Sequence, residues 1–536
     1  MAFKKKETHA QQSEDVRNAP SSELENAQDT TSAAAGEKIT FYAVFLGAVA
    51  SIGGFMFGYV SGQISGFFLM QDYARRFGEA QPDGSFTFSA TRQGTIVGML
   101  SAGCLIGALI SGKLADTFGR RLAISGAATF ACIGNIVEIS SETVWAQYAV
   151  GRGLTGISIG ALSVLVPMYQ SESSPAIIRG VLVTCYQLFV TLGIWTAEMV
   201  DWGTESRTNS ASWRIPNGLG FLWALILGVG ILFLPESPRY AYRKGHIDQA
   251  RHTIARLAGL EPNAPSVNKE IAEIEAKLSE EKGAASTKWH DIFTADRMFY
   301  RTVLGIVLQA GQQLTGANYF FYYGTTAFKA TGLSNSYVTQ LILGSVNVVC
   351  TIFGVYFIHK VGRRKALVGG ALWMMACFFV FAFVGHFALD EANPMATPRA
   401  GSVLIAFSCL AIAAFAITWG PLVWAVVAEL YPSQYRARCM ALATASNWLF
   451  NFLISFFTRF ITDKIDYLYG LVFAGCCAAL AVIVFFFLIE SKGRTLEDID
   501  TMYVHRVNPI TSAKWHPDMK EKSSSSEDGL TSNRWD

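Results

Sequence analysis

QAGQQLTGANYFFYYGTTAF, residues 309–328, is apolar enough to lie in a membrane and yet contains several amides and tyrosines. Gln312, Gln313 and Asn318 fall near one helical face, because spacings of three to seven residues return to the same side. Unpaired polar groups are costly in hydrocarbon, so these side chains should face another helix or a watery cavity. Amides donate and accept hydrogen bonds, which suits a neutral polyhydroxylated solute. The stretch therefore predicts either a ligand site or hydrogen bonds that only join helices.

The composition around this stretch is that of a polytopic helical membrane protein. The chain has 536 residues, of which 51% are hydrophobic and 16% charged, whereas soluble domains carry about 25% charged residues. The net charge of +2 gives no indication of nucleic-acid binding. The nine cysteines lie in or beside apolar runs without zinc-type spacing, so we expect buried free thiols and no metal site.

Twelve apolar runs near the ~20 residues that a membrane span needs divide the chain into two sets of six. Two of these runs lie near 301–328 and 402–429. Basic residues concentrate in alternate connections, which predicts that both termini are cytoplasmic. We expect the following domains: a disordered tail at 1–38, a six-helix half at 39–235, a linker with short amphipathic helices at 236–300, a second six-helix half at 301–489, and a C-terminal tail at 490–536.

A hidden repeat supports this division. GKLADTFGRR (112–121) has a partner in YFIHKVGRR (356–364), and PESPR (235–239) has one in IESKGR (489–494). Glu172 precedes Arg179 by seven residues, as Glu429 precedes Arg436. Three motifs in the same order indicate duplicated halves, which are typical of transporters that bind substrate between the halves at mid-membrane. A channel or a membrane enzyme would not require charged motifs at matching helix ends.

One motif is misleading. Residues 156–160, GISIG, fit the G-x-S-x-G pattern of a hydrolase nucleophile. That pattern needs a strand–turn–helix context, whereas this motif lies inside an apolar run. Its small residues are better explained by close packing of helices. We therefore expect a transporter and not an enzyme.

Several longer motifs carry a family resemblance. They are GRGLTGISIGALSVLVPMYQSE (151–172), WRIP (213–216), PESPRY (235–240), QQLTGANYFFYYG (312–324), WGPLVWAVVAELYP (419–432) and KGRTLED (492–498). Together they resemble the sugar porter family of the major facilitator superfamily, and residues 318–328 and 441–458 are most similar to fungal hexose transporters. The resemblance implies an all-α fold of twelve transmembrane helices in two pseudo-symmetric six-helix halves, without a cofactor.

The resemblance also implies a sugar site made by several spans. Its substrate-binding residues in this chain would be Gln187, Gln312, Gln313, Asn318, Asn347, Phe415, Trp424 and Asn451. Amides can bond sugar hydroxyls, and aromatic rings can cover the apolar faces of a pyranose. Tyr322 and Tyr323 would close over the sugar as an extracellular gate, with Gly316 and Gly324 allowing the span to bend. Hydrogen bonding between helices remains the alternative, above all for Gln309 and Asn447.

A second group of residues is charged and lies at the predicted cytoplasmic helix ends. Its members are Asp116, Arg120, Arg121, Glu172 and Arg179 in the first half, and Arg363, Arg364, Glu429 and Arg436 in the second. Opposite charges there would latch the halves together when the inner mouth is closed. Asp116 is expected to orient Arg120. The alternative is a set of surface charges that contribute little.

Energy coupling is the least determined feature. Proton-linked members of the family typically carry an Asp in the first span, and Val60 stands at that place in GGFMFGYVSGQISG (53–66). Arg152, the usual partner, is retained, and an intramembrane Arg needs a counter-charge or water. Glu138 either forms a structural pair with Arg152 or replaces the missing carboxylate in proton coupling. The sequence therefore favours facilitated diffusion of a hexose, with glucose preferred, across the plasma membrane.

Two alternatives remain open. One is a sugar/proton symporter, in which a proton is a second partner besides the monosaccharide. The other, less favoured because the C-terminal tail is short, is a sugar sensor. In every case the lipid bilayer is the environment.

Overall fold

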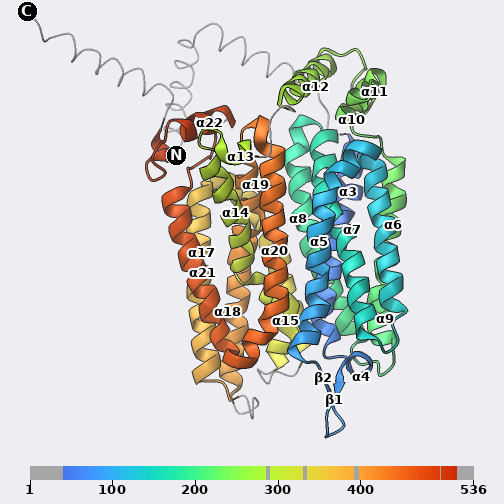
Figure 1. Cartoon of the computed structure of the whole chain (residues 1–536), viewed down its shortest axis with the longest axis vertical. Helices are drawn as coiled ribbons and strands as arrows, with labels where there is room; N and C mark the ends of the chain where they lie inside the picture. Colours follow the sequence, from blue (N-terminus) through green and yellow to red (C-terminus); the bar gives the residue numbers. More distant parts are fainter. Residues whose placement is uncertain (1–39, 285–289, 330–334, 391–396, 495, 516–536) are drawn as a thin grey trace, which may run out of the picture.

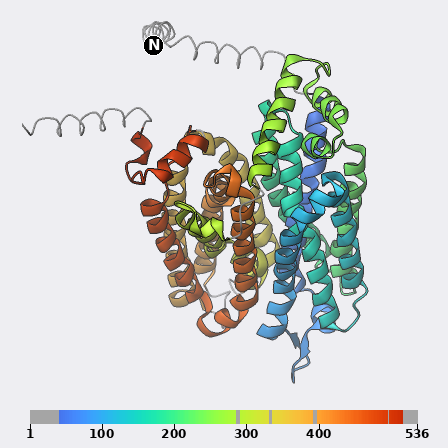
Figure 2. The ribbon, with the colours of Figure 1, turned by 45° about the horizontal axis from the view of Figure 1, so that its top comes forward.

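The computed structural model describes residues 40–284, 290–329, 335–390, 397–494 and 496–515. Among these residues, nine helical stretches are long and apolar enough to cross a membrane. One of them, Gln434–Phe487, contains two helices, and α8 (Ala176–Thr204) and the broken pair α14–α15 complete the two sets of six. The helices of the two halves stand side by side as two bundles (Figure 2). The expected all-α architecture is thus confirmed.

The first half consists of α3 (Phe41–Phe67), α5 (Ala90–Phe118), α6 (Arg120–Ile139), α7 (Trp145–Ser173), α8 and α9 (Ala211–Gly230). The second half consists of α14 (Met298–Leu314), α15 (Ala317–Lys329), α16 (Ser336–Lys360), α17 (Arg363–Phe387), α18 (Pro398–Ile417), α19 (Trp419–Glu429), α20 (Ser433–Ile465) and α21 (Tyr469–Phe487). Short elements extend two helix ends of the bundle, η1 (Ile231–Phe233) and η3 (Asp466–Leu468).

The two ends of the bundle differ. At one end lie α10 (Pro238–Arg243), α11 (Ile247–Ala258), α12 (Pro265–Ala284), α13 (Asp291–Thr294) and α22 (Leu496–Val504) (Figure 1). At the opposite end lie α4 (Gln71–Phe77) and the small hairpin of β1 (Glu79–Ala80) and β2 (Phe86–Thr87), which pair antiparallel. We call these the linker end and the hairpin end.

Small residues bring α5 and α7 unusually close together. A methyl group at Gly107 would lie 2.0 Å from the Ile157 carbonyl oxygen, and one at Gly160 would lie 2.0 Å from the Cys104 carbonyl oxygen. Close backbone approach through small residues is how helices pack where hydrocarbon offers no hydrophobic driving force. The GISIG motif therefore has a packing role within α7, as the sequence predicted.

Two of the predicted spans are each divided into two helices. The run at 301–328 is divided into α14 and α15 at Gly316, whose φ of +84° suits glycine. The run at 402–429 is divided into α18 and α19 at Thr418. Pro421 follows this second break and has no N–H with which to bond the turn before it. Gly324, also expected to allow a bend, lies inside α15.

The segment between the halves forms α10, α11 and α12, which share a small apolar core of their own. Ala250 and Ile254 of α11 pack there with Val267 and Ile271 of α12. Short helices thus occupy the described part of the segment that the sequence analysis treats as a linker. The segment after residue 489 also packs onto the body: Met502 and Tyr503 of α22 are buried, and η4 (Ser512–Lys514) follows. The tail predicted from residue 490 thus begins with a docked portion.

Candidate functional site

The two halves are joined by hydrogen bonds near the hairpin end. Tyr337 of α16 donates to the Gly66 carbonyl oxygen at 2.7 Å, and Ser65 contacts Thr325 of α15. Trp195 of α8 donates its indole N–H to Ser345 Oγ at 2.9 Å. These bonds run between α3 or α8 of the first half and α15 or α16 of the second. The seam between the halves is therefore closed at the hairpin end.

An amide cluster lies deeper in the bundle, between α14 and α20. Gln312 Nε2 donates to the carbonyl oxygens of Trp419 and Gly420 at 3.0 and 2.8 Å. Gln313 Nε2 donates to Asn447 Oδ1 at 2.9 Å, and Asn447 Nδ2 donates to Gln312 Oε1 at 2.8 Å. Gln312, Gln313 and Asn447 are all buried. Gln312 and Gln313 thus both bond Asn447, and the break before α19 supplies two acceptors for Gln312.

Asn451 connects this cluster to the first half. Its Nδ2 donates to Gln313 Oε1 at 3.1 Å. Its Oδ1 accepts from the Tyr322 hydroxyl at 3.0 Å and from Ser101 Oγ of α5 at 2.6 Å. Asn318 also donates to Gln313 Oε1. Side chains of α5, α14, α15 and α20 therefore meet at Asn451, on the seam between the halves.

Gln309 and Asn447 hydrogen-bond each other across two helices, which is the alternative that the sequence analysis gave for these two amides. Asn447 Nδ2 donates to Gln309 Oε1 at 2.8 Å and lies 3.2 Å from the Gln309 carbonyl oxygen. Both side chains are buried. These two amides hold α14 against α20.

The other expected site residues lie on separate helices. Asn347 of α16 is buried, whereas Gln187 of α8 and Trp424 of α19 are half-buried. Within the described part of the chain, no hydrogen bond joins these three to the amide cluster. Phe415 of α18 lies within 3.5 Å of a methyl group placed at Gly420, whose carbonyl oxygen accepts from Gln312. The structure thus assembles part of the predicted set in direct contact.

Sequence reasoning missed the contributions of Ser101, Phe57 and Trp448. Ser101 bonds Asn451, and the Phe57 and Trp448 rings meet edge-to-face across the seam with centroids 5.3 Å apart. The sequence offered only a weak indication of these contacts, namely a single Ser in an apolar run and aromatic residues on two distant spans.

Tyr322 and Tyr323 of α15 are buried at the seam. Tyr322 bonds Asn451, as described, and the Tyr323 hydroxyl donates to the Ser455 carbonyl oxygen at 2.5 Å. Both hydroxyls therefore tie α15 to α20. This arrangement places the expected gate residues directly beside the amide cluster.

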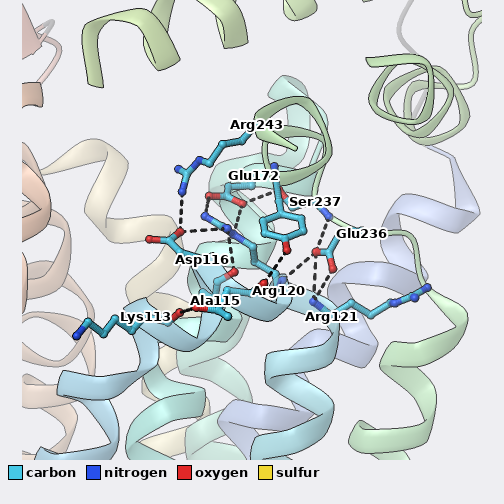
Figure 3. Close-up of polar contacts among 11 residues, drawn as sticks. Lys113, Ala115, Asp116, Arg120, Arg121, Glu172, Glu236, Ser237 and Arg243 are labelled. Atoms are coloured by element: carbon cyan, nitrogen blue, oxygen red, sulfur yellow. Dashed lines mark hydrogen bonds and ion pairs between the residues drawn. The ribbon is translucent and has the colours of Figure 1, made fainter. Parts of the chain in front are cut away.

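At the linker end, the first half carries a charge network around Arg120 (Figure 3). Arg120 Nε lies 2.8 Å from Glu172 Oε2, and both side chains are largely buried. Asp116 lies 3.4 Å from Arg120 but only 2.7 Å from Arg243 of α10. Asp116 therefore pairs chiefly with Arg243, which the sequence analysis did not foresee.

Glu236 completes this network. Its Oε1 accepts from the backbone N–H groups of Arg120 and Arg121 at 2.9 and 3.3 Å, at the start of α6. Ser237 Oγ donates to Glu172 Oε2 at 2.5 Å. The first backbone N–H groups of a helix have no partner within the helix, and a carboxylate suits the helix dipole there. Glu236 thus caps α6 from more than a hundred residues away.

The second half repeats the arrangement. Glu490 accepts from the backbone N–H groups of Arg363 and Arg364 at 2.8 and 3.2 Å, at the start of α17. Arg363 Nη2 lies 3.3 Å from Glu429 Oε1, and Ser491 Oγ donates to Glu429 Oε2 at 2.6 Å. The repeat of PESPR in IESKGR marks these residues, although the sequence analysis did not assign them a role.

Two predicted members of the charge network have other partners, and a third lies outside the described side chains. The guanidinium groups of Arg364 and Arg436 donate to the carbonyl oxygens of Phe485 and Tyr431, respectively, and the side chain of Arg179 lies outside the described residues. The ion pairs Arg120–Glu172 and Arg363–Glu429 each lie within one half. In this conformation they stabilise the separate halves, and a latch between the halves stays a prediction.

The third predicted group surrounds Val60. Arg152 and Glu138 are fully buried. Arg152 Nη1 donates to the Val60 carbonyl oxygen at 2.9 Å, and Glu138 Oε1 accepts from Thr155 Oγ1 at 2.7 Å. Among the described residues, no ion pair joins Glu138 to Arg152, and Glu138 Oε2 has no hydrogen-bond partner. The two side chains form no direct ion pair in this conformation, and their structural pairing stays a prediction.

The chain is similar to known transporters over most of its length. A family model described as "Sugar (and other) transporter" matches residues 46–503. The low-affinity glucose transporter HXT3 of Saccharomyces cerevisiae is 43% identical over 88% of this chain and 83% of its own length. The high-affinity fructose transporter ght6 of Schizosaccharomyces pombe is 43% identical over 90% of this chain and 91% of its own.

Solved structures agree on the fold. The proton:xylose symporter XylE bound to 6-bromo-6-deoxy-D-glucose superposes with a TM-score of 0.72 at 24% identity, covering 87% of this chain and 100% of that one. The inward-open conformation of the xylose transporter XylE from E. coli gives a TM-score of 0.70 at 23% identity, covering 86% and 100%. At this identity the likeness establishes the architecture alone.

Proposed function

This chain belongs to the sugar transporter family, and from that premise we propose that it carries a hexose, with glucose preferred, across the plasma membrane by alternating access. The observation that supports this most directly is the amide cluster at the seam between the halves. Duplicated halves bind their substrate at such a seam near mid-membrane. The named activities of the glucose and fructose carriers from the two yeasts agree with a hexose substrate.

Gln312, Gln313, Asn318 and Asn451 would hold the sugar. In this structure the amide groups of Gln313, Asn318 and Asn451 bond one another, Ser101 and Tyr322, and Asn447 donates to Gln312. A hydroxyl can both donate and accept, so a bound hexose can exchange for these bonds without leaving an amide unpaired. Gln187, Asn347, Phe415 and Trp424 would complete the site once the halves move.

Tyr322 and Tyr323 would act as the gate on the hairpin end, which we assign to the extracellular side. The break at Gly316 lets α15 tilt while α14 stays in place. The concentration of Lys and Arg in the connections at the linker end supports a cytoplasmic location for that end and for both termini.

Transport would proceed by facilitated diffusion. The Val60 side chain cannot bind a proton, and the Val60 carbonyl oxygen accepts a hydrogen bond from Arg152. A proton symport is the second candidate, because Glu138 is buried with one oxygen that lacks a partner. A buried carboxylate in a membrane protein is a candidate proton relay.

Radiolabelled hexose uptake into vesicles containing the purified protein distinguishes these candidates. Facilitated diffusion predicts that the sugar equilibrates along its own gradient and that a protonophore has no effect. Accumulation above the outside concentration that a protonophore abolishes would support symport, and Glu138→Gln should then abolish accumulation while leaving exchange intact. A protein that is correctly folded but moves no sugar would overturn the transport proposal.

A further inference from the structure

Two acidic residues that the proposed sugar path does not use lie buried near the hairpin end. Glu198 and Asp201 stand three residues apart on α8, and their exposed fractions are 3% and 2%. They line a small, tightly packed pocket on the seam between the halves. Its other lining residues are Gly62 and Gly66 of α3, Thr325 of α15, and Tyr337 and Gln340 of α16.

This pocket contains more hydrogen-bond acceptors than hydrogen-bond donors. Glu198 Oε1 accepts from Gln340 Nε2 across the seam at 2.9 Å. Glu198 Oε2, Asp201 Oδ1 and Gln340 Oε1 are buried and have no hydrogen-bond partner among the described residues. The amide oxygen of Gln340, which is 1% exposed, is an independent sign that a donor belongs here. Leaving buried acceptors unsatisfied costs about 1–3 kcal/mol each.

The charges around the pair do not neutralise it. Neither carboxylate forms an ion pair with a described residue. The titratable groups that face it are Tyr59 of α3 and Tyr337 of α16, whose hydroxyls donate to the Pro216 and Gly66 carbonyl oxygens. Glu205, at the end of α8, is half-buried and accepts from Asn335 at 2.7 Å, and Lys329, beyond Thr325 on α15, is exposed.

The pair has no space for a hydrated cation. A methyl group at Gly344 would lie 1.8 Å from Glu198 Oε2, and one at Gly66 would lie 2.4 Å from Asp201 Oδ2. Both carboxylates thus press against backbone, and the described residues contain no cluster of His, Cys, Asp or Glu suited to a metal ion. A proton needs no such space and supplies the missing donor.

We propose that Glu198 and Asp201 form a proton-binding site that is completed when the hairpin end closes. Burying two ionised carboxylates one turn apart on a helix without a cation is strongly unfavourable, so closure requires that at least one of them hold a proton. When the halves part, water reaches the pair and the proton leaves to the outside solution as hydronium. Closure of the outer side thus takes up a proton and opening returns it, with no net proton movement required.

This inference rests on the proposed function in one respect, namely that the hairpin end opens and closes during transport. A rise in outside pH then favours the open form and slows closure. One proton changes the closed-to-open ratio by at most about tenfold per pH unit. Equilibrium exchange of radiolabelled glucose in proteoliposomes, with outside pH varied from 5 to 8, should therefore slow as the pH rises.

The double variant Glu198→Gln/Asp201→Asn should make exchange independent of outside pH. Glu142→Gln, an exposed carboxylate at the same end of the bundle, should keep the wild-type dependence. Wild-type exchange that ignores outside pH, or a double variant that keeps the dependence, would overturn the inference.

A second measurement separates this inference from the transport proposal. The closed form holds a proton that the unfolded chain releases at neutral pH, so the free energy of unfolding should fall as the pH rises. Thermal unfolding of the purified protein between pH 5.5 and 8 should show this fall in wild type and Glu142→Gln, and not in the double variant. That result without sugar transport would overturn only the transport proposal. Transport without that result would overturn only the proton site.

Discussion

Glu236 and Glu490 make the same contact in the two halves: each carboxylate accepts from the first backbone N–H group of a distant helix, at 2.9 Å for Arg120 and 2.8 Å for Arg363. Each follows the last helix of its half, and a serine after each bonds a further glutamate, Glu172 or Glu429. The duplication visible in the sequence therefore extends to individual hydrogen bonds. Each half is closed by its own network at the linker end.

Replacing either carboxylate by an amide should destabilise its half. Glu236→Gln and Glu490→Gln each remove a charge from a helix N-terminus, where an N-terminal cap contributes about 0.5–2 kcal/mol. We expect similar losses in the free energy of unfolding from the two variants, measured by thermal unfolding of purified protein. Glu273→Gln on exposed α12 surface is the control and should change stability by less than about 0.5 kcal/mol. A loss in only one of the two variants would contradict the equivalence.

Gly119 should not tolerate a side chain. Its φ is +89°, and a methyl group there would lie 2.4 Å from Glu236 Oε2. Gly119→Ala should therefore lower the unfolding temperature through backbone strain and displacement of the cap. Gly126→Ala, within α6 and with open space around it, should be neutral or slightly stabilising. Equal unfolding temperatures for the two variants would show that a side chain at Gly119 causes no backbone strain.

Two variants of the amide cluster should distinguish residues that bind the sugar from residues that only pack helices together. Gln312→Ala should weaken sugar binding by about 1–3 kcal/mol, or about 5–150-fold in Kd, while the protein still reaches the cell surface. Gln309→Ala removes a bond between α14 and α20 and should lower the amount of folded protein with little change in affinity. Sugar binding by isothermal calorimetry and surface labelling measure the two effects. Unchanged affinity in Gln312→Ala would remove residues 309–328 from the site.

The docked segment after residue 489 should contribute to stability. Arg301 is 1% exposed and lies 2.5 Å from Asp500 Oδ1 of α22, with its guanidinium over the Tyr503 ring. Asp500→Ala leaves a buried cation without its carboxylate. Because Asp500 is itself partly exposed, the expected loss is about 1–3 kcal/mol in chemical unfolding.

A surface ion pair provides the comparison for this variant. Asp463→Ala breaks the exposed pair with Arg459, and it should cost less than about 0.5 kcal/mol. If both aspartate variants lower the free energy of unfolding by the same amount, the Arg301–Asp500 pair stabilises the protein no more than a surface ion pair does.

The helical architecture and the division into halves could be predicted because apolar length and repeated motifs are local properties of the sequence. The bend at Gly316 was expected from the sequence, although its contact with Phe473 exists only after folding. The break at Thr418 was not expected, because the run around it is apolar and carries no comparable signal.

The site was predicted in part for a related reason. Gln312 and Gln313 are conspicuous as amides in an apolar span, and the family resemblance adds Asn451; the structure joins Asn451 to Gln313, and Asn447 to Gln312. Pairing across the seam depends on tertiary geometry, so the contact of Ser101 with Asn451 was missed. Glu138 and Arg152 were paired by charge alone, but Arg152 instead bonds the Val60 backbone.

The position of the two capping carboxylates has a consequence for biosynthesis. Glu236 and Glu490 are synthesised only after every membrane span of their half, and each then binds the start of that half's third span. The cap of a half therefore cannot form before its last span has been synthesised. Because Glu236 precedes the whole second half in the chain, the cap of the first half can form while the second is still being translated.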